Sequence, residues 1–148
     1  MGLDMYLTKQ IYVGANYAFN EVKGEINLTK HGEKIDIDLS KVTYITEEVA
    51  YWRKANQIHN WFVEHVQNGN DDCGTYYVSI EQIQELVKTC KLILENRDTE
   101  LARELLPTCS GFFFGNTDYD DDYFEDLENT VDQLDGLEEA DYEYHSSW

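Results

Sequence analysis

Apolar and polar residues alternate along the first third of the chain, which is the pattern of strands with one buried face. The first such run covers residues 3–13. Residues 22–28 and 35–39 alternate in the same way on either side of a turn, and they predict a β-hairpin whose turn uses Gly32 for a positive φ. Residues 42–45 are either a further strand or the approach to a helix.

A repeat of three to four residues replaces this alternation in the rest of the chain and predicts helices. We expect the first helix over residues 46–66, with an apolar face made of Trp52, Ala55, His59, Phe62 and Val66. Ser79 and Gln82 form a capping box that opens a second helix of about 16 residues. A short third helix is expected over residues 99–106, and residues 124–137 keep a helical step.

Three short segments complete the predicted organisation. Residues 76–78 are strand-like, and residues 112–114 are three phenylalanines between glycines, which favours a buried strand. Residues 139–148 are expected to be a frayed acidic end. The sequence therefore predicts one α+β domain over residues 1–148, with an early antiparallel hairpin packed against three to four helices.

The net charge of −19 is distributed unevenly along the chain. Residues 1–103 contain 16 acidic residues and all 11 lysines and arginines, whereas residues 104–148 contain 14 acidic residues and no lysine or arginine. Such a charge repels nucleic acid and anionic membranes and favours basic partners. We therefore expect neither direct nucleic-acid binding nor membrane association. Three widely spaced cysteines and the lack of a secretory signal favour the reducing cytoplasm.

Carboxylates and aromatic residues alternate in the C-terminal region and form the first candidate site. Interfaces favour tyrosine and tryptophan as anchors, and spaced carboxylates can imitate the charge pattern of phosphates. The candidate partner-binding residues are Asp118, Tyr119, Asp120, Asp121, Asp122, Tyr123, Glu125 and Asp126. The competing interpretation is that these acids only keep a small domain soluble.

The first predicted helix supplies a second candidate site, because it places a histidine among aromatic residues. In this interpretation a tryptophan stacks on a nucleotide base, and Arg53 or Lys54 meets phosphate. The candidate pocket residues are Trp52, Arg53, Lys54, Asn56, His59, Asp72, Cys73 and Phe113. The competing interpretation is a histidine packed in the core between aromatic rings.

Motifs for catalysis and metal binding are weak. Cys73 follows two aspartates, and neighbouring negative charge disfavours a reactive thiolate. The cysteines and histidines lack zinc-site spacing. The aspartates of residues 116–122 lack the glycine and glutamate positions of a calcium loop, which leaves only loose divalent binding open. We expect no catalytic residues, no metal site and no cofactor, and we lean against an enzyme.

Four stretches of the chain are distinctive in combination. They are GLDMYL at residues 2–7, YWRKANxIHxWF at residues 51–62, DDCG at residues 71–74 and GFFFG at residues 111–115. Together they resemble a group of small uncharacterised proteins from phages, prophages and their bacterial hosts. The resemblance brings no catalytic residues. It implies an accessory protein that acts in the cytoplasm of the bacterial host cell.

Two functions follow from these candidate sites. The first is a phage-type accessory or anti-defence protein that binds and inhibits a basic, nucleic-acid-binding host protein, such as a defence nuclease, by nucleic-acid mimicry. The second is a small-ligand binding protein or enzyme, with a nucleotide in the pocket around Trp52, Arg53, His59 and Cys73. A structural or assembly role is a third. We favour the first, because the charge asymmetry is a property of the chain whereas the pocket is inferred.

Overall fold

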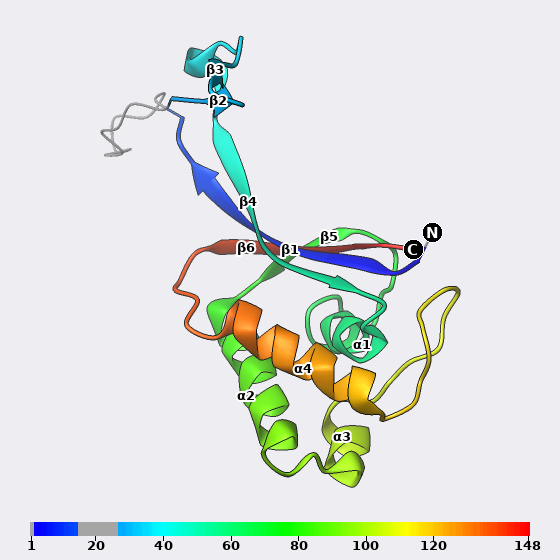
Figure 1. The fold of residues 1–148 in the computed structure, drawn as a ribbon. Coiled ribbons are helices and arrows are strands. Elements are labelled where there is room, and N and C mark those ends of the chain that lie inside the picture. The colour runs from blue at the N-terminus through cyan, green and yellow to red at the C-terminus, as the bar shows by residue number, and fades with distance from the viewer. Residues whose placement is uncertain (1, 15–26) are drawn as a thin grey trace.

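The computed structural model describes residues 2–14 and 27–148, and a four-stranded sheet forms one layer of it (Figure 1). The strands lie in the order β4-β1-β6-β5, and each neighbouring pair is antiparallel. Their bounds are Asp4–Tyr12 for β1, Tyr44–Arg53 for β4, Thr75–Val78 for β5 and Asp141–Ser147 for β6.

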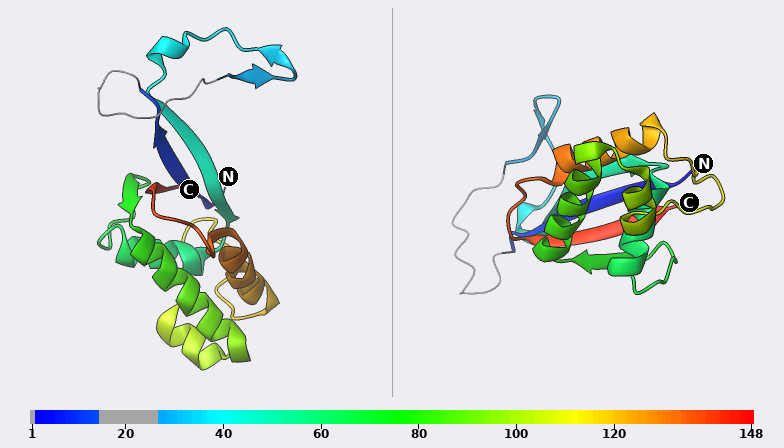
Figure 2. Two further views of the ribbon diagram at one scale, coloured as in Figure 1. Left: turned by 90° about the vertical axis from the view of Figure 1, so that its left-hand side faces the viewer. Right: turned by 90° about the horizontal axis from the view of Figure 1, so that it is seen from below.

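Four helices all lie on one side of this sheet (Figures 1 and 2). They are α1 (Asn56–His65), α2 (Ile80–Asn96), α3 (Thr99–Leu105) and α4 (Asp121–Leu134). Of these, α3 is the farthest from the sheet (Figure 1). The predicted fold class, an α+β domain with antiparallel strands and three to four helices, is confirmed. None of the helices in the described ranges has the length and apolar character needed to cross a membrane.

The alternation in β1 separates a buried face from an open one, as the sequence predicts. Met5 and Leu7 are fully buried under the helices. Tyr6 lies on the other face, where its ring is 5.3 Å from that of Tyr51 and 5.1 Å from that of His145, measured between centroids. The helices leave this face uncovered (Figure 1).

The capping box predicted for α2 is present. The Ser79 hydroxyl accepts a hydrogen bond from the Gln82 backbone N–H at 3.2 Å, and the Ser79 N–H donates to Gln82 Oε1 at 3.0 Å. These two bonds give partners to the backbone N–H groups of Ser79 and Gln82, which the helix itself cannot supply. The helix then runs for 17 residues, with its apolar side against α4 and the sheet.

The predicted hairpin is confirmed only at its tip. Strands β2 (Thr29–Lys30) and β3 (Glu33–Lys34) pair across a turn in which Gly32 has φ 82°. Of the expected strand over residues 22–28, residues 22–26 lie outside the described residues. The expected strand over residues 35–39 is wrong, since this segment is irregular and leads into the 3₁₀ turn η1 (Leu39–Lys41).

The expected helix over residues 46–66 is wrong in its first half. Residues 44–53 form β4, in which Ala50 and Trp52 are buried and alternate with exposed Tyr51 and Arg53. The chain then turns at Lys54, whose φ is 59°, and only afterwards becomes helical as α1. Aromatic residues at this alternating spacing favour a strand once β1 is available as a partner, so tertiary pairing overrides the helical spacing.

The C-terminal end is not frayed. Residues 141–147 form β6, which lies between β1 and β5 and pairs with both. Tyr142 and Tyr144 are fully buried on its core face. Their alternation with acidic and polar residues is a strand pattern, and pairing on both sides outweighs the repulsion that the acidic composition suggested.

The expected buried strand over residues 112–114 is also wrong. Phe112 is 74% exposed and Phe113 is 48% exposed, whereas Phe114 packs into the core. Phe113 has φ 63°, which is incompatible with a strand. The segment is an irregular loop between α3 and α4 (Figure 1).

Deletion of residues 141–148 is expected to abolish the cooperative thermal unfolding transition. The deletion removes an interior strand and two of the largest fully buried side chains, so neither β1 nor β5 keeps that neighbour. Circular dichroism during heating measures the transition. A truncated protein that melts within about 3 °C of the full chain would contradict this role of β6.

Candidate functional site

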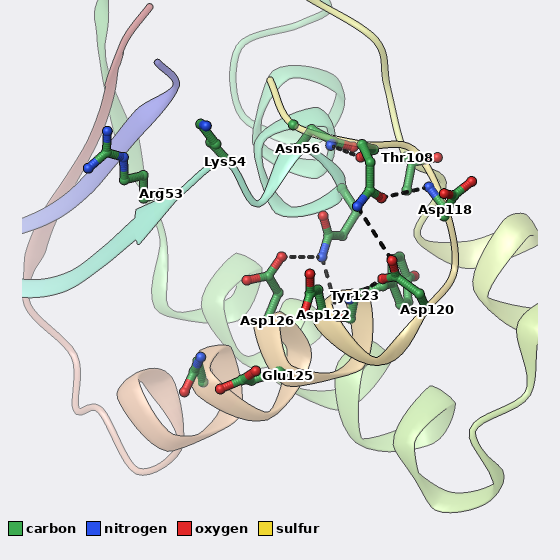
Figure 3. A pocket seen from close by; sticks show the side chains of 14 residues that line it. Arg53, Lys54, Asn56, Thr108, Asp118, Asp120, Asp122, Tyr123, Glu125 and Asp126 are labelled. Atoms are coloured by element: carbon green, nitrogen blue, oxygen red, sulfur yellow. Dashed lines mark hydrogen bonds between the residues drawn. The ribbon is translucent and has the colours of Figure 1, made fainter. Parts of the chain in front are cut away.

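A pocket of about 400 Å³ lies where the start of α1, the loop after α3 and the first turns of α4 meet (Figure 3). It brings together two residue groups that the sequence suggested separately. Arg53, Lys54 and Asn56 come from the predicted ligand pocket. The other group comes from the predicted acidic surface: Asp118, Asp120, Asp122, Tyr123, Glu125 and Asp126.

Asn56 holds the loop that forms one wall of the pocket. Its Nδ2 donates to the carbonyl oxygens of Phe114 at 3.1 Å and Asn116 at 2.7 Å, and its Oδ1 accepts from the Cys109 backbone N–H at 3.0 Å. The side chain is 2% exposed. All three hydrogen bonds of its side chain therefore go to this loop, and Asn56 holds the pocket wall in position.

Gln57 joins α1 to α4 at the base of the pocket. Its Nε2 donates to the Tyr123 carbonyl oxygen at 3.4 Å and to Asp126 Oδ2 at 3.0 Å. Figure 3 draws the bond to Asp126 as a dashed line. The pKa of Asp126 is raised to about 6, because burial removes water from its carboxylate and Asp122, Glu125 and Asp120 add negative charge, while the bond from Gln57 acts in the opposite direction.

The first turn of α4 fixes the positions of several acidic side chains. Asp120 is the N-cap, and its carboxylate accepts a hydrogen bond from the Tyr123 N–H at 3.1 Å. Asn116 Oδ1 accepts from the Asp118 N–H at 2.9 Å and so orders the approach to the helix. Carboxylates are favoured at a helix N-terminus, where they meet the positive end of the macrodipole.

The carboxylates that line the pocket have no cationic partner within residues 2–14 and 27–148. Arg97 pairs instead with Asp121 and Glu128, which lie outside the lining. Arg53 Nε is 3.9 Å from Asp4. The pocket therefore holds five carboxylates against two cations, Arg53 and Lys54, and in the described part of the protein none of these carboxylates forms an ion pair.

The tyrosines predicted on this surface are packed inward. Tyr123 is 3% exposed, and its hydroxyl donates to the Leu106 carbonyl oxygen at 2.8 Å. Burial raises the pKa of its phenol. Tyr119 is partly buried beside Arg103, whose guanidinium carbon lies 4.9 Å from the ring centroid. On the predicted acidic surface, the groups that face solvent are therefore mainly the carboxylates.

Five residues of the predicted ligand pocket lie outside the lining of this cavity: Trp52, His59, Asp72, Cys73 and Phe113. Trp52 is buried, and its Nε1 donates to the Thr130 hydroxyl at 2.9 Å. Asp72 accepts hydrogen bonds from the Gly74 backbone and the Tyr76 hydroxyl, which lower the Asp72 pKa. Trp52, which is 3% exposed, has no open ring face on which a base could stack, and Cys73 is a partly buried free cysteine in the loop before β5.

His59 has no solvent-exposed surface and is enclosed in a hydrogen-bonded chain. Its Nδ1 is 2.7 Å from the Tyr144 hydroxyl oxygen, and its Nε2 is 3.0 Å from Asp71 Oδ2. Asp71 Oδ1 accepts in turn from Trp148 Nε1 at 3.0 Å. The packed-core interpretation of this histidine therefore matches its surroundings, and its partners fasten β6 and the end of the chain to α1.

Sequence reasoning missed the amide residues of the pocket. Gln57, Asn116 and Asn129 contribute to its lining, and so does Thr108. Neutral amides give no charge or motif signal, and their position becomes evident only when α4 docks beside α1. The helical spacing of residues 124–137 was the one available sign of that docking.

Neither a metal-binding cluster in the described part of the chain nor a similar known protein indicates a function. Among the residues that the structure describes, no three or more His, Cys, Asp and Glu side chains are grouped so as to hold a metal ion. No protein-family model, curated protein or solved structure matches the chain. The residues of the pocket are therefore the basis for proposing a function.

At about pH 7.5, Asp126→Asn is expected to raise the free energy of unfolding by about 1 kcal/mol, after a discount for the partial exposure of Asp126. This corresponds to a rise in the melting temperature of roughly 3 °C. The folded-state pKa of about 6 lies above the ordinary value of 3.8, so the aspartate destabilises the fold increasingly as pH rises through 6. The variant lacks this penalty and keeps an acceptor for Gln57. Differential scanning fluorimetry of both proteins should show the difference vanishing near pH 4. A pH-independent difference would contradict the assignment.

Tyr144→Phe is expected to lower the free energy of unfolding by about 1–3 kcal/mol, because it leaves the buried His59 Nδ1 without its partner. Tyr77→Phe is the matched control, since Tyr77 lies on the neighbouring strand and is 58% exposed. Chemical denaturation measures both. Equal losses in the two variants would show that the hydroxyl of Tyr144 has no special role.

Proposed function

We propose that this chain is a phage-type accessory protein that binds and inhibits a basic, nucleic-acid-binding protein of the bacterial host cell, such as a defence nuclease. The binding element is the acidic surface formed by Asp118, Asp120, Asp121, Asp122, Glu125 and Asp126. The proposal keeps the mobile-element context implied by the sequence resemblance.

One observation supports this proposal: five carboxylates of α4 and its approach line a single pocket, and Asp121 lies next to them in the chain, outside the lining. The helix contains six acidic residues among 14 and no lysine or arginine. Unneutralised charge of one sign steers an oppositely charged partner and raises its association rate.

Inhibition follows from the chemistry of the expected partner. A nucleic-acid-binding groove collects lysine and arginine to meet phosphates. Carboxylates fixed along a capped helix offer those side chains alternative partners, and a folded domain seated there excludes the nucleic acid sterically. The tyrosines act indirectly, since they hold α4 in place from within.

A nucleotide ligand is the second candidate, because Arg53 and Lys54 line the same pocket. Five carboxylates share that lining and oppose a phosphate, and Trp52 is buried where it cannot stack on a base. A thermal-shift series with mononucleotides and cyclic nucleotides distinguishes the two. A nucleotide-induced rise in melting temperature that Arg53→Ala removes would favour the second candidate.

The capture of host proteins at low and high salt tests the first candidate. We expect basic proteins to bind the immobilised chain at low salt, to elute as ionic strength rises, and to lose nucleic-acid binding when the chain is added. A variant with Asp118, Asp121 and Asp122 changed to Asn and Glu125 to Gln should lose this capture.

The matched control removes the same number of charges elsewhere, through Glu85, Glu95, Glu104 and Glu139 changed to Gln, which are all exposed. It should retain capture. Equal losses in both variants would indicate a nonspecific charge effect. Failure to capture any basic protein, or capture without loss of nucleic-acid binding, would overturn the proposal.

A further inference from the structure

Gln57, a nearly buried residue that lines the acidic pocket, has a side-chain oxygen to which no described residue donates a hydrogen bond. Gln57 is 2% exposed, and both of its recorded side-chain hydrogen bonds use Nε2. In the described part of the chain, no group donates a hydrogen bond to its Oε1. This oxygen is also in contact with solvent, since it is absent from the fully enclosed side-chain atoms that have no partner. Because Gln57 itself lines the pocket, beside Tyr123 and Asp126, its Oε1 is available to a donor placed there.

The carboxylate beside this amide also has an unused oxygen. Asp126 Oδ2 accepts the bond from Gln57, whereas Oδ1 receives none from the described residues. Asp122 and Glu125 lie on the same helix and line the same pocket without an ion pair to any described residue. A neutral amide oxygen and several carboxylates thus present acceptors to one small volume, and a cation with several donors could meet more than one of them at once.

We infer that this pocket is a subsite for the guanidinium group of an arginine side chain, presented by the basic partner. The inference rests on the proposed function for the identity of that partner. Guanidinium is planar and carries five N–H donors, which suits a carboxylate and an amide oxygen placed side by side. The volume of about 400 Å³ accommodates the side chain, with the rest of the partner outside.

Other cations fit the same residues less well. A metal ion requires three or more ligands that converge at short distance, and the described residues contain no such group. The ammonium group of lysine is a compact, strongly hydrated charge with three donors, so it matches fewer of the dispersed acceptors. The protein's own Lys54 and Arg53 lie exposed at the pocket (Figure 3), and neither is ion-paired to its carboxylates.

A titration with Nα-acetyl-arginine methylamide, followed by ¹⁵N NMR of the full chain, tests the inference. We expect saturable shifts at α1 and the start of α4, with a dissociation constant on the order of 1 mM. The citrulline analogue, which has the same shape without charge, should give no saturable shift. The lysine analogue should bind several-fold more weakly.

Two variants and a control assign the binding to this pocket. Asp126→Asn and Gln57→Leu should each weaken arginine binding by about tenfold, a loss of about 1.4 kcal/mol. Glu138→Gln removes one exposed charge outside the lining and should leave the affinity unchanged. Affinity for the wild type should rise from about pH 5 to about pH 7 as Asp126 ionises, and it should stay level in Asp126→Asn.

The outcomes separate this inference from the proposed function. Arginine binding at the pocket without capture of any basic protein would support the subsite and overturn the function. Capture of a basic protein that survives Asp126→Asn and Gln57→Leu would support the function and overturn the subsite. Citrulline binding as tightly as arginine, or equal losses in Asp126→Asn and Glu138→Gln, would also overturn the subsite.

Discussion

Three buried polar side chains near the start of α1 connect this helix to α4, to β6 and to two loops. Buried polar groups must find hydrogen-bond partners, and these three reach in different directions. Asn56 holds the loop before α4, Gln57 holds α4 itself, and His59 holds both the loop at Asp71 and the last strand at Tyr144. Apolar packing brings the layers together, but it is nondirectional, so these bonds fix their relative positions.

The same helix connects the stability of the fold with its candidate function. Through His59 it secures β6, which is central to the sheet although it comes last in the chain. Through Gln57 it sets a partly desolvated carboxylate among other acids. Like charges brought together in this way destabilise a domain that already carries a charge of −19. Such an arrangement is typical of binding sites, where a partner supplies the missing charge.

Local patterns predicted the elements that depend on local physics. The alternation in β1, the capping box of α2 and the glycine turn between β2 and β3 are examples. Elements that depend on distant partners were mistaken: Trp52 satisfies both a helical and an alternating spacing, and pairing with β1 decides between them. Acidic composition obscured the alternation of Tyr142 and Tyr144. The acidic half of the site was evident because charge is visible in sequence, whereas Gln57 gained its role only when α4 packed beside it.

On our proposal, Asp126 is a partly desolvated carboxylate whose counter-charge comes from the partner, and it is not simply one more solubilising acid. Its side-chain carboxyl ¹³C chemical shift, followed through a pH titration with and without excess Nα-acetyl-arginine methylamide, tests this directly. We expect the pKa of Asp126 to be about 6 in the free protein and to fall towards the ordinary value of 3.8 when the guanidinium is bound. A free-protein pKa at the ordinary value, or one that arginine leaves unchanged, would contradict it.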